Sequence, residues 1–304
     1  MPFAYTGEVC ALLSALVWSV ALILFRLSGL RVPPISLNLF KNTIALGLFA
    51  LTLTVVGGGW KEFATFAWRD IAILAISGML GIALADTVLF YALNRLGVGL
   101  LAVVECLYSP FVILFAALLL GDTLQPVQYF GAGMIVLAVL TCSRHAPPDA
   151  CTRGQLIGGL LLGAAAMALM AGGIVMAKPV LNRPFPLFWA ASIRLFAGTA
   201  LLFVLAGISP ARRTYWGVFR PSRVWWVSIP GAILGTYVAM LFWVAGFKYA
   251  QSAVAGILNQ TASVFALMLA TLVLKEPFTR RKVFAVAFAF SGVLLVMFGN
   301  RLFS

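Results

Sequence analysis

The chain has 304 residues, of which 63% are hydrophobic and only 10% are charged, and its formal net charge at pH 7 is +13. A single globular core cannot bury so many apolar side chains, so the composition excludes an ordinary soluble domain and predicts a protein that crosses the membrane several times. The basic residues are spread over many short connections, which is typical of loops at an anionic membrane surface and not of a nucleic-acid-binding face.

Ten apolar runs follow one another with short polar breaks between them, and each is about long enough to cross roughly 30 Å of hydrocarbon as a helix. They cover residues 8–25, 35–56, 71–91, 99–120, 127–142, 154–177, 188–206, 224–247, 252–274 and 283–298. The first run has no basic segment before it, which favours an uncleaved helix over a signal peptide. The runs predict an all-α membrane protein with ten transmembrane helices.

The fourth and ninth runs resemble each other at a constant offset of about 154 residues, so that Asp122 aligns with Glu276 at their ends. Lys41 lies 153 residues before Arg194, which extends the repeat to other runs. Each half therefore has five helices. Because five is odd, the second half enters the membrane from the opposite face, which predicts two inverted repeats. The expected division is 1–143 for the first repeat, 144–153 for a linker and 154–304 for the second repeat.

Four ionisable residues, Lys41, Asp86, Glu105 and Arg194, lie well inside apolar runs. Together they cost about 10 to 14 kcal/mol unless partners or water compensate them. Their depths predict that Lys41, Asp86 and Glu105 share one level of the membrane, with Arg194 at the mirrored depth. Either Lys41 forms a structural ion pair with one of the acids, or the four residues face a central cavity and bind an anionic group, an amine or a proton.

Polar residues also surround the position of Glu105 and its counterpart in the other repeat. Tyr108 lies one helical turn after Glu105, and the aligned stretch carries Asn259 and Gln260. One half thus has a charge where the other has amides, which indicates an asymmetric substrate. Amides that join helices are an equal alternative.

Aromatic and thioether side chains have two possible roles. Ser14 and Trp18 share a helix face in the first run, where they form either an aromatic wall for a ligand or interior packing. Met167, Met170 and Met176 in the sixth run are interpreted as packing.

The sequence offers no chemistry of the kind that enzymes use. It has one histidine, His145, its four cysteines show no paired spacing, and it has no phosphate-binding loop. We therefore expect no metal, no cofactor, no nucleic acid partner and no enzymatic activity.

Lysine and arginine counts predict the orientation. Apart from Lys41 and Arg194, thirteen basic residues fall on one predicted face, and six fall on the face that carries both termini. The positive-inside rule puts the thirteen in the cytoplasm and both termini outside. The basic segment 212–223 is typical of a loop anchored at lipid headgroups, so membrane lipids, including anionic ones, are expected partners.

These features resemble the drug/metabolite transporter superfamily, and in particular its EamA-type members with ten helices. The resemblance covers nearly the whole chain and is carried by Trp18, by Lys41 and Arg194, by the pattern VVECLYSPF with Pro110, and by the exits LLLGDTL and LVLKEPF. Asp122 departs from the glutamate usual at such exits. The resemblance implies a secondary transporter without ATP, frequently an amino-acid exporter, with both termini in the cytoplasm. That orientation conflicts with the charge count, and both remain open.

We expect a secondary active transporter that moves a small zwitterion such as an amino acid across the inner membrane by alternating access, with export favoured and a proton as the coupling ion. The cations would attract the carboxylate, and an acid would hold the amine or the proton. The candidate substrate-binding residues are Lys41, Glu105, Arg194, Asp86, Trp18, Tyr108, Asn259 and Gln260. Two alternatives stay open: a transporter of phosphorylated or nucleotide-linked sugars, and a lipid-handling membrane protein.

Overall fold

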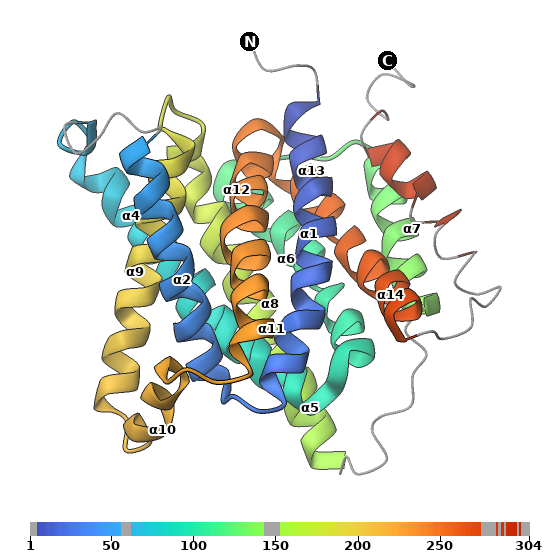
Figure 1. Ribbon diagram of the computed structural model, residues 1–304. Coiled ribbons are helices and arrows are strands. Elements are labelled where there is room, and N and C mark those ends of the chain that lie inside the picture. The colour runs from blue at the N-terminus through green and yellow to red at the C-terminus, as the bar shows by residue number, and fades with distance from the viewer. Residues whose placement is uncertain are drawn as a thin grey trace.

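The structure is a computed structural model that describes residues 5–55, 62–142, 153–274, 284, 287–288, 290–296 and 298. Most of the predicted linker, 144–153, lies outside the described residues, as do part of the tenth run and Glu276. The described chain is built from helices (Figure 1). In a bilayer, a helix satisfies the backbone polar groups within its own segment, which is why long apolar runs adopt it.

In the first half, α2 carries Lys41, and a π-helix, η1, precedes Asp86. The elements are α1 Thr6–Gly29, α2 Pro34–Val55, α4 Trp68–Gly78, η1 Met79–Ala85, α5 Asp86–Glu105, α6 Tyr108–Leu120 and α7 Pro126–Cys142.

In the second half, α9 carries Arg194, and a second π-helix, η3, precedes α12. The elements are α8 Arg153–Leu181, α9 Leu187–Ile208, α10 Arg212–Trp216, the 3₁₀ turn η2 Gly217–Phe219, α11 Trp225–Gly231, η3 Ala232–Val238, α12 Ala239–Tyr249, α13 Ser252–Asn259 and α14 Thr261–Leu274.

Several of these helices have the length and composition of membrane spans. Among the described residues, the long apolar stretches are Thr6–Gly29, Pro34–Val55, Trp68–Gly97, Arg153–Leu181, Leu187–Ile208 and Trp225–Tyr249. Large apolar side chains face outward, as Leu118, Phe130 and Phe196 show with exposures of 71%, 67% and 66%. Such a surface suits contact with lipid chains. The prediction of an all-α membrane protein is confirmed.

Several elements recur at the same spacing in the two halves. The π-helices begin at Met79 and Ala232, 153 residues apart, and α5 and α13 end at Glu105 and Asn259, 154 residues apart. In Figure 1, α1 runs from the top downward, whereas α8 runs from the bottom upward. Near the two ends of the described chain, the ring centroids of Tyr5 and Phe298 lie 5.0 Å apart.

The third, fourth and ninth apolar runs do not each form one continuous, separate helix. The third and fourth runs meet within α5, where Gly97 alone is non-helical, with φ 71° and ψ 176°. A positive φ of this kind is open to glycine and strained for other residues. The fourth run then breaks after Glu105, two residues before α6, where Pro110 lacks the N–H that would continue the helix. The ninth run breaks at Gln260.

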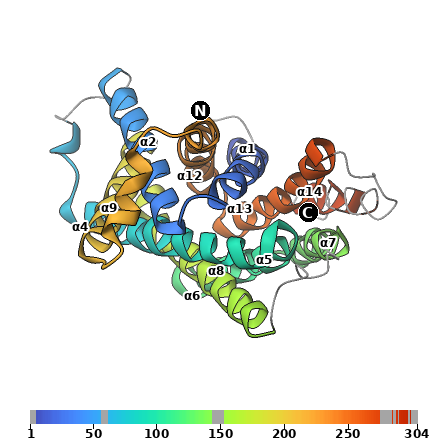
Figure 2. The same ribbon diagram turned by 60° about the horizontal axis from the view of Figure 1, so that its bottom comes forward.

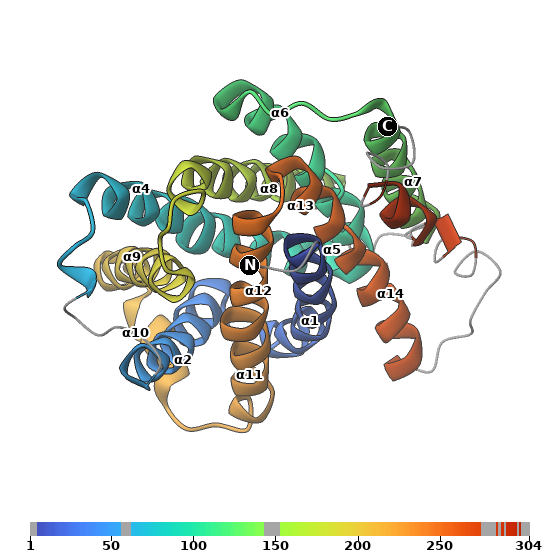
Figure 3. The ribbon, with the colours of Figure 1, turned by 90° about the horizontal axis from the view of Figure 1, so that it is seen from above.

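Seen from above, α1 and α12 lie in the middle, with α2, α4 and α9 on one side and α7 and α14 on the other (Figure 3). On the underside, α5 crosses α8 (Figure 2). Glycines make the approach possible: a Cβ on Gly159 of α8 would lie 2.7 Å from Leu96, and one on Gly163 would lie 2.6 Å from Val104. Close backbone approach is the usual way in which membrane helices pack.

Two lysines join the ends of α8 and α12 reciprocally, and we call them the lysine clasp. Lys178, near the end of α8, donates to the carbonyls of Phe247 and Ala250. Lys248, near the end of α12, donates to the carbonyls of Leu181, Arg183 and Phe185 at 3.0, 3.1 and 2.8 Å. Each ammonium binds backbone carbonyls at or just after the C-terminal end of the other helix, which is also the favourable place for a cation.

Candidate functional site

A cavity of about 140 Å³ lies between the two halves of the molecule. Helices of both halves form its wall, among them α1, α2, α5 and α6 from the first half and α8, α9, α12 and α13 from the second. All eight residues predicted to bind substrate line it: Trp18, Lys41, Asp86, Glu105, Tyr108, Arg194, Asn259 and Gln260. Residues that are far apart in the sequence thus meet at one place.

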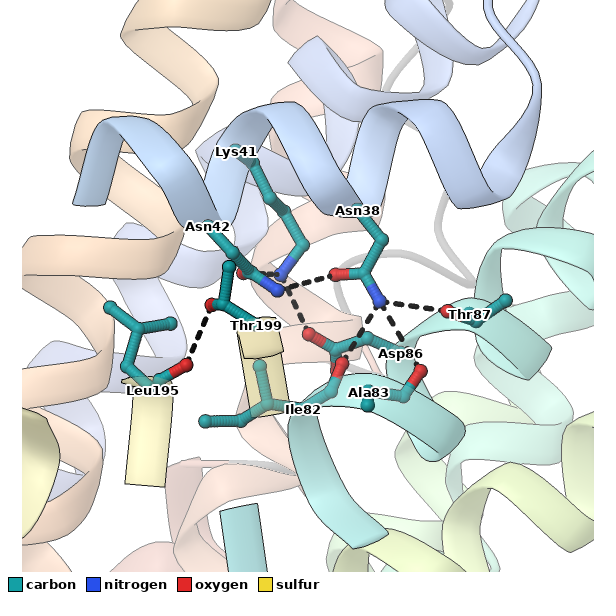
Figure 4. A network of polar contacts seen from close by, with 9 residues as sticks. All are labelled: Asn38, Lys41, Asn42, Ile82, Ala83, Asp86, Thr87, Leu195 and Thr199. Carbon is teal, nitrogen blue, oxygen red and sulfur yellow. Dashed lines mark hydrogen bonds and ion pairs between the residues drawn. The ribbon is translucent and has the colours of Figure 1, made fainter. Parts of the chain in front are cut away.

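Lys41 and Asp86 form an ion pair at the edge of this cavity (Figure 4). The Lys41 ammonium lies 2.7 Å from Asp86 Oδ2 and donates to Asn42 Oδ1 at 2.9 Å. The side chain of Lys41 is 1% exposed and that of Asp86 is 11% exposed. The sequence left Asp86 and Glu105 as possible partners of Lys41, and in the structure the partner is Asp86. The charges of Lys41 and Asp86 therefore compensate each other.

Asn38 fixes the segment that carries Asp86. It lies one turn before Lys41 and Asn42 on the same face of α2, and its amide donates to the carbonyl of Ile82 at 2.9 Å and to Thr87 Oγ1 at 2.8 Å (Figure 4). Ile82 belongs to the π-helix η1, whose wider turn departs from the α-helical bonding pattern. The polar face of α2 therefore holds the start of α5 in place.

Arg194 is fully buried in α9 and lies on the cavity wall. Its Nη1 donates to Ser77 Oγ, and its guanidinium carbon lies 5.3 Å from the ring centroid of Trp243. Within the described part of the chain, Nε and Nη2 have no hydrogen-bond partner. Buried arginine donors are normally paired, so this edge of the guanidinium is suited to bind an anion.

Glu105 lies at the break between α5 and α6. Its backbone carbonyl accepts a hydrogen bond from Gln260 Nε2 at 2.8 Å, which joins the breaks of the two halves. Its Oε2 accepts a longer bond from Ser263 Oγ at 3.4 Å. No cation in the described residues lies within ion-pair distance of this carboxylate. Among the described residues, Glu105 is therefore an acidic group without a counter-ion.

The rest of the wall is largely apolar. Trp18, Met167, Met170, Met240 and Trp243 line it. The interpretation of Met167 and Met170 as packing alone is therefore incomplete, because a cavity-facing thioether gives the same sequence pattern as a core one.

One polar residue of this region, Ser77, was missed from the sequence. Ser77 was not singled out, because a single serine in an apolar run carries no signal of its own. Ser263 follows Asn259 by one helical turn in the ninth run, and this spacing indicates that it lies with Asn259 and Gln260 beside the cavity.

Comparison with known proteins shows which family this chain belongs to. Residues 5–144 and 157–298 each match the model of the EamA-like transporter family. Protein PecM of Dickeya dadantii (strain 3937) is 26% identical over 233 residues, which are 75% of this chain and 73% of PecM. A solved crystal structure with 20% identity has the same fold, with a TM-score of 0.78 over 98% of this chain and 99% of that one.

The family matches cover both halves of the chain, in agreement with the internal repeat. The expectation of a transporter and not an enzyme is confirmed by them. This chain belongs to the EamA-like transporter family and is a multi-pass membrane transporter.

Proposed function

We propose that this chain is a secondary active transporter that exports a small zwitterion, most simply an amino acid, across the inner membrane by alternating access. In this proposal ten transmembrane helices form two inverted repeats, and the substrate binds in the cavity between them. The opposite directions of α1 and α8 and the repeated π-helices support it (Figure 1). Transporters built in this way bind substrate near the bilayer midplane, where the repeats meet.

The observation that carries the proposal is the distribution of charges around the cavity. Lys41 and Asp86 compensate each other, which leaves Arg194 and Glu105 as one cation and one anion with no ion-pair partner among the described residues. Uncompensated charge in a membrane interior is costly, and such residues are characteristic of substrate sites. A zwitterion compensates both groups at once.

The proposed roles follow from this distribution. Arg194 binds the carboxylate, Glu105 binds the amine, and the apolar wall with Trp18 and Tyr108 surrounds the side chain. Asn259 and Gln260 complete the polar side of the cavity beside Glu105. When the amine leaves, Glu105 takes up a proton, which makes a proton the coupling ion. A phosphorylated sugar fits less well, because Glu105 repels its phosphate.

A thermal-stability screen of the detergent-purified protein tests the proposal. A ligand that binds only the folded state raises its apparent stability. We expect a larger rise with leucine than with leucinamide, which lacks the carboxylate, or with 4-methylpentanoate, which lacks the amine. A rise with glucose 6-phosphate or with lysophospholipid, and none with leucine, contradicts the proposal. Efflux from proteoliposomes loaded with the stabilising compound then tests transport and its direction.

A further inference from the structure

Ser77 is buried in the last turn of α4, and it is not part of the cavity wall. Its hydroxyl makes two contacts. It donates to the carbonyl of Gly173 in α8, and it accepts a hydrogen bond from Nη1 of Arg194 in α9. A serine hydroxyl has one hydrogen to give and lone pairs to accept with, so both bonds form together. One side chain of the first half thus links two helices of the second half.

Glycines hold these three helices close together. α4 lies against both α8 and α9 (Figure 3). A Cβ on Gly173 would lie 3.0 Å from the carbonyl oxygen of Ser77, and a Cβ on Gly198 of α9 would lie 2.8 Å from that of Gly78. The backbones therefore approach to a spacing that larger residues would not permit, and the hydroxyl of Ser77 has a fixed position relative to α8 and α9.

The bond from Nη1 determines which edge of the guanidinium is available. With Nη1 held by Ser77, the side edge formed by Nε and Nη2 has no partner in the described chain. This edge carries two parallel N–H groups, which is the geometry for two hydrogen bonds to one carboxylate. Nη2 also lies beside Gly81 of the cavity wall, where an added Cβ would be 3.6 Å away.

The neutrality of Ser77 matters as much as its position. Lys41, the counterpart of Arg194 in the first repeat, is held by the carboxylate of Asp86 and loses its net charge to that pair. Arg194 is held by a hydroxyl and keeps its charge for a ligand. The position 153 residues after Ser77 is Pro230, which has no side-chain hydrogen-bonding group, so the arrangement belongs to one repeat only.

We propose that Ser77 is a positioning residue for the carboxylate subsite of the transporter: it aims the Nε–Nη2 edge of Arg194 into the cavity without neutralising it. This inference rests on the proposed function. Because the same hydroxyl also bonds to α8, a shift of α8 against α4 would turn the guanidinium, so that carboxylate affinity follows the packing between the halves.

The test compares the dissociation constants of leucine and leucinamide for the purified protein and for Ser77→Ala. We expect leucine to bind about 10-fold or more weakly to the variant, the size of effect for losing a hydrogen bond to a charged group, whereas leucinamide is unaffected. A merely structural role would weaken both ligands equally, and that result would overturn the proposal. Ser228→Ala is the matched control, because Ser228 is also buried and bonds to Ser28 of another helix at 3.0 Å, away from the cavity.

Two further measurements keep the test decisive. Ser77→Cys keeps the shape of the side chain with a somewhat larger atom and replaces the hydroxyl by a weak acceptor, so it carries the same comparison if the alanine variant does not fold. If the wild-type protein binds neither probe, the proposed function fails, but the structure of the Ser77 variant still decides the role of Ser77. An Arg194 guanidinium that leaves its place supports the inference, and one that stays overturns it.

Discussion

The ammonium of Lys41 lies 2.7 Å from Asp86 Oδ2, and this pair joins α2 to the residue that follows the π-helix η1. The pair removes one cation and one anion from the set of charges around the cavity. What remains is Arg194 on one helix and Glu105 at a helix break, both without a counter-ion in the described chain. The ion pair therefore determines which charges of the cavity are available to a ligand.

The ion pair makes a prediction for stability. Lys41→Met should destabilise the protein by about 3 to 5 kcal/mol, because it leaves the buried carboxylate of Asp86 uncompensated. The double variant Lys41→Met with Asp86→Asn should recover most of this loss, since no buried charge remains. Unfolding of the two variants and the wild type by SDS in mixed micelles measures both effects. A double variant no more stable than Lys41→Met would contradict the pairing.

The two unpaired charges make a prediction for ligand selectivity. Glu105→Gln should weaken leucine binding by about 10-fold or more without weakening that of 4-methylpentanoate, because only leucine has an amine for the carboxylate. Arg194→Gln should weaken leucine similarly and leave leucinamide unchanged. Isothermal titration of each variant with the three compounds gives the comparison. Equal losses for all three ligands would mean that these residues serve folding and do not contact the substrate.

Much of the site could be predicted from the sequence, because a membrane interior makes charged residues costly and therefore rare. Lys41, Asp86, Glu105 and Arg194 stood out for that reason, and all four line one cavity. Their pairing could not be predicted. The depth argument put Lys41 level with both acids, and only the position of side chains across the α2–α5 contact selects Asp86.

Other features lacked a sequence signal for a physical reason. Ser77 has its role through Gly173 and Arg194, which lie about a hundred residues away in the chain. Trp243 and Met170 line the cavity, but large apolar side chains look the same in a sequence whether they face a ligand or a neighbouring helix. The helix break at Gln260 contains no proline or glycine that would indicate it in the sequence.

The contact between the two helix breaks makes a further prediction. Gln260→Met should destabilise the protein by about 1 to 3 kcal/mol, because it removes the 2.8 Å bond to the carbonyl of Glu105 and leaves that carbonyl unsatisfied. Gln251→Met is the matched control: it removes a bond of 2.9 Å to the carbonyl of Thr123 that lies at an exposed place, where water replaces it. In thermal unfolding, Gln260→Met should therefore lower the stability more than Gln251→Met does. Equal effects would show that the bond between the breaks contributes nothing particular.

The lysine clasp is expected to stabilise the end of the molecule where α8 and α12 finish. Lys248→Met removes three bonds to backbone carbonyls, and Lys178→Met removes two. Each variant should lose about 1 to 3 kcal/mol of stability, the cost of carbonyls that lose their donors. The loss in the double variant should be smaller than the sum of the single losses, because the first change already loosens the contact that the second lysine uses. Arg31→Met, at an exposed turn, is the control and should stay within about 0.5 kcal/mol of the wild type.

SDS unfolding of the single and double lysine variants measures the coupling between Lys178 and Lys248. Strictly additive losses would show that the two lysines act independently and do not form one clasp.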